Sequence, residues 1–436
     1  MTPSTSADSF YRFRPLNVGR FAVWLLFAIA LIVAPLLFTS SLAMTMLSQI
    51  GYLIIICLSY NILLGQGGML SFGHAIYTGL GSFTAVHLMN LAGEGRVPMP
   101  LVLIPVAAGL GGAFFAALFG YVTTKKSGTT FAMITLGLGE LVAAMGLMFP
   151  SFFGGEGGVT TNRVYGKFLW WDFGPQIQVY YLIAAYCFVC TALMFAFTGT
   201  PLGRILNAVR DNPERVEFIG YNTQRVRYLA FIISGFFAGI GGGLAAINFE
   251  IVNASDSLST IRSGGYLLFT FLGGATFFFG PIIGAVLLVF ASILLSELSK
   301  AWLLYLGLVF LLMVMFAPGG IASLIMMNLR VASFGKFRRL RGLYAGLAAA
   351  AVLLIAGLAA IVEMIYHIQL DAALGPKVRF IATELDTSSS ATWALAVALA
   401  VAGGALLEWL RRRFVQVWGK AQEEIEAEIK RKEMGA

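Results

Sequence analysis

Charged side chains are concentrated in one short segment of an otherwise apolar region, GRILNAVRDNPERVEFIGYN (203–222). Guanidinium and carboxylate groups on a helix form ion pairs and hydrogen bonds with another protein surface. We therefore interpret the segment as a docking surface, at which a partner protein would supply energy to this chain. The residues that we expect to serve this contact are Arg204, Arg210, Asp211, Asn212, Pro213, Glu214, Glu217 and Gly220.

Local signals divide this segment into two short helices. Thr200 is a good N-cap, and apolar residues recur at helical spacing from Leu202 to Val209. Asn212 followed by Pro213 ends that helix and begins another. Gly220 suits the C-terminal end of the second helix, because glycine adopts the left-handed conformation at no steric cost.

Other polar residues lie within apolar segments. Glu140 stands in the middle of TFAMITLGLGELVAAMGLMF, where an ionisable group faces a water-filled or protein interior. It either contacts a solute path or fixes helix packing through a hydrogen bond. Asn61, Gln66, Ser71 and His74 surround a glycine-rich turn. These four residues either line the path or satisfy the backbone of a broken helix.

No sequence motif indicates catalysis or metal binding. The chain lacks H-E-x-x-H, G-x-S-x-G and the phosphate loop G-x-x-x-x-G-K-[ST]. Its three histidines, His74, His87 and His367, are too scattered for a metal site. We predict no catalytic residue, no metal site and no cofactor on this chain, so any ATP hydrolysis, with its ATP and Mg²⁺, would take place on another chain.

The composition indicates an integral membrane protein. Hydrophobic residues make up 58% of the 436 residues and charged residues 11%. The mean hydropathy is +0.84, which is outside the range of soluble domains. We expect an all-α polytopic fold, with both termini cytoplasmic, about ten core spans and two further C-terminal spans. The expected spans lie near 21–39, 43–64, 72–92, 101–123, 129–149, 178–198, 228–249, 264–279, 282–297, 301–317, 342–365 and 391–410.

Lysine and arginine placement orients these spans. With the N-terminus inside, the predicted cytoplasmic segments contain 22 of the 29 lysines and arginines. Residues 199–227 then form a cytoplasmic loop. The same bias accounts for the net charge of +8 without a nucleic-acid partner.

Glycines mark two further features. Gly235, Gly239 and Gly243 are spaced four apart, which lets helix backbones approach closely, so we assign them to helix packing. Gly67-Gly68 and Gly273-Gly274 each precede a Phe-Gly pair, and short glycine-rich spans near 264–297 suggest tilted, broken or re-entrant helices. Two such matches can also arise by chance.

The longest external loop of the first ten spans covers 151–177. Its paired glycines and its aromatic residues suit an interfacial lid or a docking face for an extracytoplasmic partner.

Five motifs follow one another along the chain. They are GQGGMLSFGHAIYTGLGSF (65–83), TTFAMITLGLGEL (129–141), GGEGGVT (154–160), TPLGRILNAVRDNPERVEFIGYN (200–222) and LGGATFFFGPIIGAV (272–286). In this order they resemble the motifs of LivM-type permease subunits of bacterial ABC importers for branched-chain amino acids and related compounds. The resemblance covers roughly residues 20–325.

The resemblance implies a multi-pass protein of the bacterial inner membrane and a set of partners. These are a homologous LivH-type permease, two cytoplasmic ABC ATPases and a periplasmic substrate-binding protein, besides the lipid bilayer. Glu217 and Gly220 match the coupling-helix motif that seats such permeases in the ATPase. The substrate would be a branched-chain amino acid or a related small polar or carboxylate solute, with urea, amides, and aromatic or dicarboxylic acids as alternatives. An ion-coupled secondary transporter is the alternative of another class, and a scaffolding subunit a third.

The chain departs from this family in its C-terminal tail. We predict that the tail is an accessory clamp or stabiliser outside the transport route, so that truncation after Arg330 preserves some transport. The predicted organisation is an N-terminal segment 1–20, a permease domain 21–325 that includes the coupling loop 199–227, a basic linker 326–341, a two-span extension 342–410 and a charged helix within 411–436.

Overall fold

A computed structural model describes residues 18–165, 171–317, 319–370, 375–380 and 383–434 of the chain. Most of the predicted N-terminal segment and part of the loop 151–177 lie outside the described residues. The chain divides into two compact units, Met1–Leu63 with Met69–Ser263 and Leu64–Gly68 with Gly264–Ala436. This boundary falls inside the predicted permease domain 21–325.

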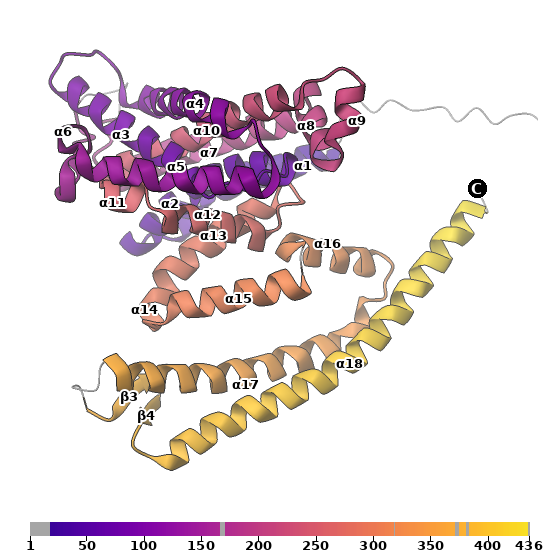
Figure 1. The fold of residues 1–436 in the computed structure, drawn as a ribbon. Coiled ribbons are helices and arrows are strands. Elements are labelled where there is room, and N and C mark those ends of the chain that lie inside the picture. Colours follow the sequence, from indigo (N-terminus) through magenta and orange to yellow (C-terminus); the bar gives the residue numbers. More distant parts are fainter. Residues whose placement is uncertain (1–17, 166–170, 318, 371–374, 381–382, 435–436) are drawn as a thin grey trace, which may run out of the picture. The chain divides into compact units, whose positions relative to one another are not determined.

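The first unit is a bundle of long helices (Figure 1), and it also contains short helices and one two-residue strand pair. Its elements are α1 (Val18–Leu37), α2 (Ser41–Asn61), the start of η1 (Ile62–Gln66), α3 (His74–Gly93), η2 (Leu101–Leu103), α4 (Ile104–Thr123), α5 (Gly128–Met148), α6 (Pro150–Phe153), η3 (Gly155–Gly157), β1 (Val159–Thr160), α7 (Gln176–Gly199), α8 (Pro201–Asp211), α9 (Pro213–Phe218), α10 (Thr223–Phe249), β2 (Ile251–Val252), α11 (Ala254–Ser257) and the start of α12 (Thr260–Gly273).

The core of this unit is centred on α10, which packs against α2, α3 and α4. A Cβ added at Gly239 would lie 2.5 Å from the carbonyl oxygen of Ala108 on α4, and one at Gly235 would lie 2.3 Å from the Cβ of Ala116. A Cβ at Gly243 would lie 2.5 Å from the Cβ of Ala108. The absence of side chains at these three positions therefore sets the close approach of α10 and α4.

The two glycine pairs noted in the sequence both mark breaks between helices. Gly68 has φ +63° after the π-helical turn η1, and Gly274 has φ +115° after α12. An L side chain rarely adopts such values, so glycine is required for these turns. Each break precedes a further helix, which begins at His74 in one case and at Gly280 in the other.

The second unit continues from α12 with short helices and ends in a long helical hairpin (Figure 1). Its further elements are α13 (Gly280–Phe290), η4 (Ala291–Leu295), α14 (Ser296–Leu298), α15 (Trp302–Phe316), α16 (Gly320–Ser333), α17 (Phe337–Leu370), β3 (Lys377–Phe380), β4 (Thr383–Asp386) and α18 (Ser390–Met434).

The C-terminal extension is an antiparallel pair of helices, α17 and α18. The hairpin β3–β4 lies between the end of α17 and the start of α18. A Cβ at Gly357 would lie 2.4 Å from the Ala400 nitrogen, and one at Gly403 would lie 2.4 Å from the Leu354 nitrogen, so small residues bring these helices together. The charged segment predicted as a helix within 411–436 is helical through Met434, and it continues the second helix of the extension, because α18 runs without a break for 45 residues. The predicted linker 326–341 is formed largely by the end of α16 and the start of α17.

Seven helices of the described chain are long and apolar enough to cross a membrane, or eight if the bent pair α15–α16 is one span. The chain is therefore an all-α, multi-pass membrane protein apart from its two small strand pairs. The segment expected near 264–279, for which the sequence also allows a tilted, broken or re-entrant helix, is short: α12 has 14 residues and is about 21 Å long. The helix near 282–297 is also interrupted, since α13 has 11 residues and passes into the π-helical turn η4.

Candidate docking site in the loop 199–227

Three side-chain caps define the helices of the loop. Thr200 Oγ1 accepts a hydrogen bond from the Gly203 nitrogen at 3.2 Å, and Asn212 Oδ1 accepts one from the Arg215 nitrogen at 3.0 Å. These bonds satisfy amide groups that lack partners at the beginning of a helix. The predicted starts of α8 and α9 are thus confirmed. Asn222 in turn caps α10.

A left-handed residue closes α9. Gly220 has φ +91°, and no atom outside its chain neighbours lies within 4 Å of the position that its Cβ would occupy. The Gly220 nitrogen donates to the Glu217 carbonyl at 2.9 Å, and the Tyr221 nitrogen donates to the Val216 carbonyl at 3.2 Å. Backbone conformation, and not crowding, therefore requires glycine at this position.

The α8 helix is seated firmly on the bundle. Leu206 is 0% exposed and Val209 is 5% exposed, and a Cβ at Gly203 would lie 2.3 Å from the carbonyl oxygen of Phe197 on α7. Arg210 pairs with Asp211 at 2.9 Å. The loop is thus a structured element, and of the eight residues predicted to meet a partner all are exposed except Asn212, which is half-buried.

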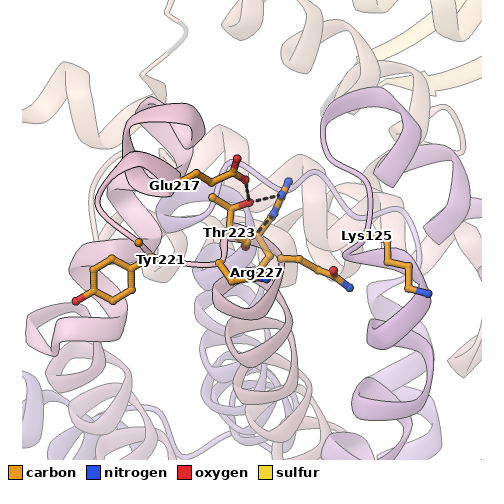
Figure 2. Close-up of a pocket in the computed structure, with 8 residues that line it drawn as sticks. Lys125, Glu217, Tyr221, Thr223 and Arg227 are labelled. Carbon is orange, nitrogen blue, oxygen red and sulfur yellow. Dashed lines mark hydrogen bonds between the residues drawn. The ribbon is translucent and has the colours of Figure 1, made fainter.

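A polar bridge connects α9 with the first turn of α10. Thr223 Oγ1 donates to Glu217 Oε1 at 2.8 Å and accepts from Arg227 Nη2 at 3.1 Å, while Arg227 Nε donates to the Thr223 carbonyl at 3.2 Å (Figure 2). Arg227 is 9% exposed. A buried guanidinium needs such partners, because an unpaired charge loses its hydration without compensation.

This bridge forms one wall of an open pocket of about 480 Å³. Figure 2 shows Lys125, beyond the end of α4, on the other side of the pocket. Cationic groups from Lys125 and Arg227 and the carboxylate of Glu217 therefore border one hollow. The complete lining is Lys125, Glu217, Gly220, Tyr221, Asn222, Thr223, Gln224 and Arg227.

Apolar side chains project from the tip of the loop beside the pocket. Phe218 is 89% exposed and Ile219 is 70% exposed, whereas Val216 on the opposite face is 3% exposed. A large aromatic residue with polar surroundings is typical of a protein contact in which the aromatic group fills a pocket of the partner. Lys125, Thr223, Arg227 and these apolar residues were not predicted as site residues. The only signals for them were a Lys-Lys pair after an apolar run and an arginine at the start of another.

Glu140 belongs to the first unit but is not buried in its interior. Its side chain is exposed on α5, and Thr260 Oγ1 donates to its Oε1 at 2.5 Å. Met133, 65% exposed, and Leu141, 51% exposed, belong to the exposed surface of the same helix. A carboxylate near the middle of a membrane-length helix is thus presented outward beside apolar side chains.

The polar residues near Gly68 are deeply buried. Asn61, Ser71 and His74 are each at most 2% exposed, and His74 Nε2 is 2.9 Å from Ser59 Oγ. Gln66 is half-buried and belongs to the second unit, which includes residues 64–68.

Other side chains satisfy the backbone at this break. Tyr60 Oη accepts from the Ser71 nitrogen at 3.2 Å, and Thr135 Oγ1 accepts from the Phe72 nitrogen at 3.1 Å. Ser263 Oγ accepts from the Ala75 nitrogen at 2.9 Å. The broken helix is therefore stabilised by Tyr60, Thr135 and Ser263, none of which was predicted.

The described part of the loop 151–177 is tied to the segment after α10. β1 pairs with β2, and the Arg163 nitrogen donates to Glu250 Oε1 at 2.9 Å. Tyr165 Oη donates to the Met99 carbonyl at 3.3 Å, and burial raises the pKa of Tyr165 to about 12. Tyr165 therefore remains a hydrogen-bond donor at neutral pH, and the loop is held by several contacts.

Comparison with known families decides the class of this protein. Residues 42–318 match the family model described as "Branched-chain amino acid transport system / permease component". The chain belongs to this permease family. The matched region contains the docking loop 199–227 and ends before the extension of α17 and α18.

Individual relatives are permease proteins of transport systems. The chain is 27% identical to the "High-affinity branched-chain amino acid transport system permease protein LivM" of Escherichia coli, over 62% of this chain and 67% of the relative. It is also 27% identical to the LivM protein of Salmonella typhimurium, over 64% and 70% of the two chains. The "Nucleoside ABC transporter permease protein NupC" of Lactococcus lactis is 23% identical over 46% of this chain and 65% of that protein. No solved structure matches the chain.

Proposed function

We propose that this chain is the membrane-spanning permease subunit of an ATP-driven importer in the bacterial inner membrane. Family membership supports a transport role, and the capped, outward-facing helix α9 supports coupling to separate ATPase subunits. The observation that carries the coupling proposal is the exposure of Phe218 and Ile219 at the end of α9, beside a pocket with charged walls.

Coupling requires that a force on α9 reaches a membrane helix. The bridge from Glu217 through Thr223 to Arg227 joins α9 to the first turn of α10, and α10 is the central helix of the first unit. Closure of two ATPases around ATP would move α9 and shift the populations of inward-facing and outward-facing states. In this proposal the permease transmits the motion of α9 to α10 and supplies no catalytic group.

A second, homologous permease would complete the translocation path. Glu140 is exposed on α5, and a charge facing lipid at mid-span costs at least about 2.5 kcal/mol. A partner surface or an aqueous path shared with it would remove that cost. Asn61, Gln66, Ser71 and His74 remain candidates for the path, together with Glu140.

The proposed substrates are branched-chain amino acids or related small polar and carboxylate solutes, delivered by a periplasmic binding protein. The LivM relatives support this class. Urea, amides, and aromatic or dicarboxylic acids are the alternatives within this family. These substrates are distinguished by an uptake assay with labelled leucine, in which an unlabelled member of each other solute class is added as a competitor.

Nucleosides are a second candidate class. The relatives include NupC and the "Guanosine ABC transporter permease protein NupQ" of Bacillus subtilis, which is 31% identical over 27% of this chain and 40% of that protein. Competition of leucine uptake by guanosine tests this class in the same assay.

An ion-coupled secondary transporter is the competing mechanism. Coupling to ions generally uses interacting charged groups within the spans. The recorded hydrogen-bond partner of Glu140 is the neutral hydroxyl of Thr260. Uptake that follows an imposed ion gradient and continues without ATPase subunits would establish this alternative.

Cysteine cross-linking tests the coupling proposal. The native cysteines, Cys57, Cys187 and Cys190, are buried, so Phe218→Cys introduces an exposed thiol at the tip of the loop. We expect a short bifunctional reagent to join this thiol to an ATPase subunit in the intact complex. The control is Tyr121→Cys, which places a thiol at a position that is 58% exposed on α4. Cross-linking of the control alone, or of neither variant, would contradict the proposal.

A further inference from the structure

Three helix ends of the second unit meet in one small apolar cluster. Val331 from α16, Leu340 from α17 and Ile425 from α18 are each 0% exposed and pack together, with Tyr344 and Phe414 against them. Lys336 Nζ lies 2.7 Å from Glu424 Oε2 and adds an ion pair beside the cluster. The cluster fixes the relative positions of these three helix ends.

Exposed arginines surround this cluster. Arg330 precedes Val331, Arg338 and Arg341 lie on either side of Leu340, and Arg413 precedes Phe414. All four arginine side chains are exposed. Because their neighbours pack together, the four arginines border one apolar cluster, with Arg413 at its Phe414 end. We call these four residues the basic cluster.

The carboxylates near the basic cluster that form ion pairs do so with other cations. Glu408 is paired with Arg411 at 2.6 Å and with Arg412 at 2.9 Å, and Glu424 is paired with Lys336. Among the residues that the structure describes, no ion pair involves any of the four arginines. Glu423 and Glu426 lie on either side of Ile425, and Glu423 lies ten residues beyond Arg413, about 15 Å along a helix.

The basic cluster lies next to two long apolar helical segments, at the start of one and after the end of the other. No charged residue occurs from 342 to 362 in α17 or from 390 to 407 in α18, and both helices are candidate membrane spans. The guanidinium of Arg413 lies 4.1 Å from the ring centroid of Trp409, and that of Arg341 lies 6.0 Å from the ring centroid of Phe337. Arginine beside aromatic rings at the end of a span is typical of the headgroup level of a bilayer.

We propose that the basic cluster binds the headgroups of anionic phospholipids and so anchors the C-terminal extension at the membrane surface. Several basic residues next to a span attract anionic lipid, and the guanidinium fork matches the geometry of a phosphate group. The site lies outside the region that matches the permease family. The inference does not depend on which solute the protein transports.

Lipid titration of the purified complex tests this proposal. The two lipids compared are phosphatidylglycerol and phosphatidylcholine with identical acyl chains. Native mass spectrometry counts how many molecules of each lipid the complex retains. We expect a preference for phosphatidylglycerol that weakens as ionic strength rises, because the attraction is screened within a Debye length. The variant R338Q/R341Q/R413Q should lose this preference, by about fivefold in affinity for each arginine, from about 1 kcal/mol per residue.

A matched control separates the basic cluster from total charge. The variant K420Q/K430Q/R431Q removes the same number of positive charges farther along α18 and should keep the preference. The proposal is overturned if the wild-type complex does not discriminate between the lipids, or if both variants lose discrimination equally. It is also overturned if the arginine variant releases an ATPase subunit while its lipid preference is unchanged, since the arginines would then bind protein. If that variant does not fold, R338K/R341K/R413K, which keeps the charge and loses the fork, should show a weaker preference than the wild type.

Discussion

Thr223 and Glu217 are joined by a hydrogen bond of 2.8 Å that connects the last turn of α9 with the first turn of α10. Thr223 also accepts a hydrogen bond from Arg227, so its hydroxyl group is the centre of the bridge. The bridge offers a direct route by which a contact at α9 can reach a core helix.

Replacement of this hydroxyl should weaken coupling. Thr223→Val keeps the shape of the side chain but removes both hydrogen bonds, leaving the buried Arg227 with fewer partners. Such a loss costs about 1–3 kcal/mol. We expect ATP-driven uptake by reconstituted vesicles to fall several-fold, while Thr223→Ser restores most of it. Equal uptake by the valine and serine variants would show that the bridge takes no part in coupling.

Changes at the end of α9 should abolish transport. Gly220→Asp places a side chain on a residue with φ +91°. Glu217→Lys replaces the carboxylate of the bridge with a cation, on the other side of Thr223 from the Arg227 guanidinium. We expect substrate-stimulated uptake to be lost while the membrane helices still assemble, as measured by size-exclusion chromatography of the complex. Gly199→Asp is the matched control, because Gly199 is exposed and a Cβ there meets no atom within 4 Å. Normal uptake by both α9 variants would remove this helix from the mechanism.

The position of Glu140 can be probed with a thiol reagent. In the complete complex we expect Glu140→Cys to react with a hydrophilic reagent, because this position should face a partner interface or an aqueous path. Leu118→Cys, at a position that is 56% exposed on α4, should react at least about tenfold more slowly if it faces lipid. Equal, slow labelling at both positions would place Glu140 in the lipid and contradict the proposal.

Close packing of α10 on α4 should make Gly239 intolerant of a methyl group. Gly239→Ala places a Cβ 2.5 Å from the Ala108 carbonyl, and such overpacking costs about 1–3 kcal/mol. We expect the apparent melting temperature in detergent to fall by several degrees. Gly137→Ala should not lower it, because no atom lies within 4 Å of the added carbon and alanine favours a helix. Equal melting temperatures for the two variants would refute the packing argument.

Removal of the extension should leave a working permease. Truncation after Ser333 keeps α16 whole and removes α17 and α18, which lie outside the matched family region. The truncation also removes Glu363, which accepts hydrogen bonds from the hydroxyl groups of Ser299 and Tyr305, so we expect reduced stability with part of the uptake retained. An assembled but inactive truncated complex would show that the extension belongs to the transport mechanism.

Features that depend on local contacts could be predicted from the sequence. The caps at Thr200 and Asn212 and the turn at Gly220 each involve residues within a few positions of one another, so their chemistry is visible in the chain. The hydrophobic periodicity that marks most of the long helices is also local.

Features that depend on distant contacts could not be predicted. Thr135 and Ser263 satisfy the backbone at residues 72 and 75 across separations of 63 and 188 residues, and nothing near either residue indicates this role. The length of α18 was missed because charged residues after Arg413 suggested a new element, although glutamate and lysine are good helix formers and continue the helix.

The central claim is that separate ATPases drive this permease through α9. The most direct measurement is leucine uptake by vesicles that contain both permeases, both ATPases and a saturating binding protein, with ATP inside. We predict ATP-dependent uptake for the wild type and for Gly199→Asp, and none for Gly220→Asp in an equally assembled complex. Wild-type uptake by Gly220→Asp, or uptake by the wild type without ATP, would contradict this account.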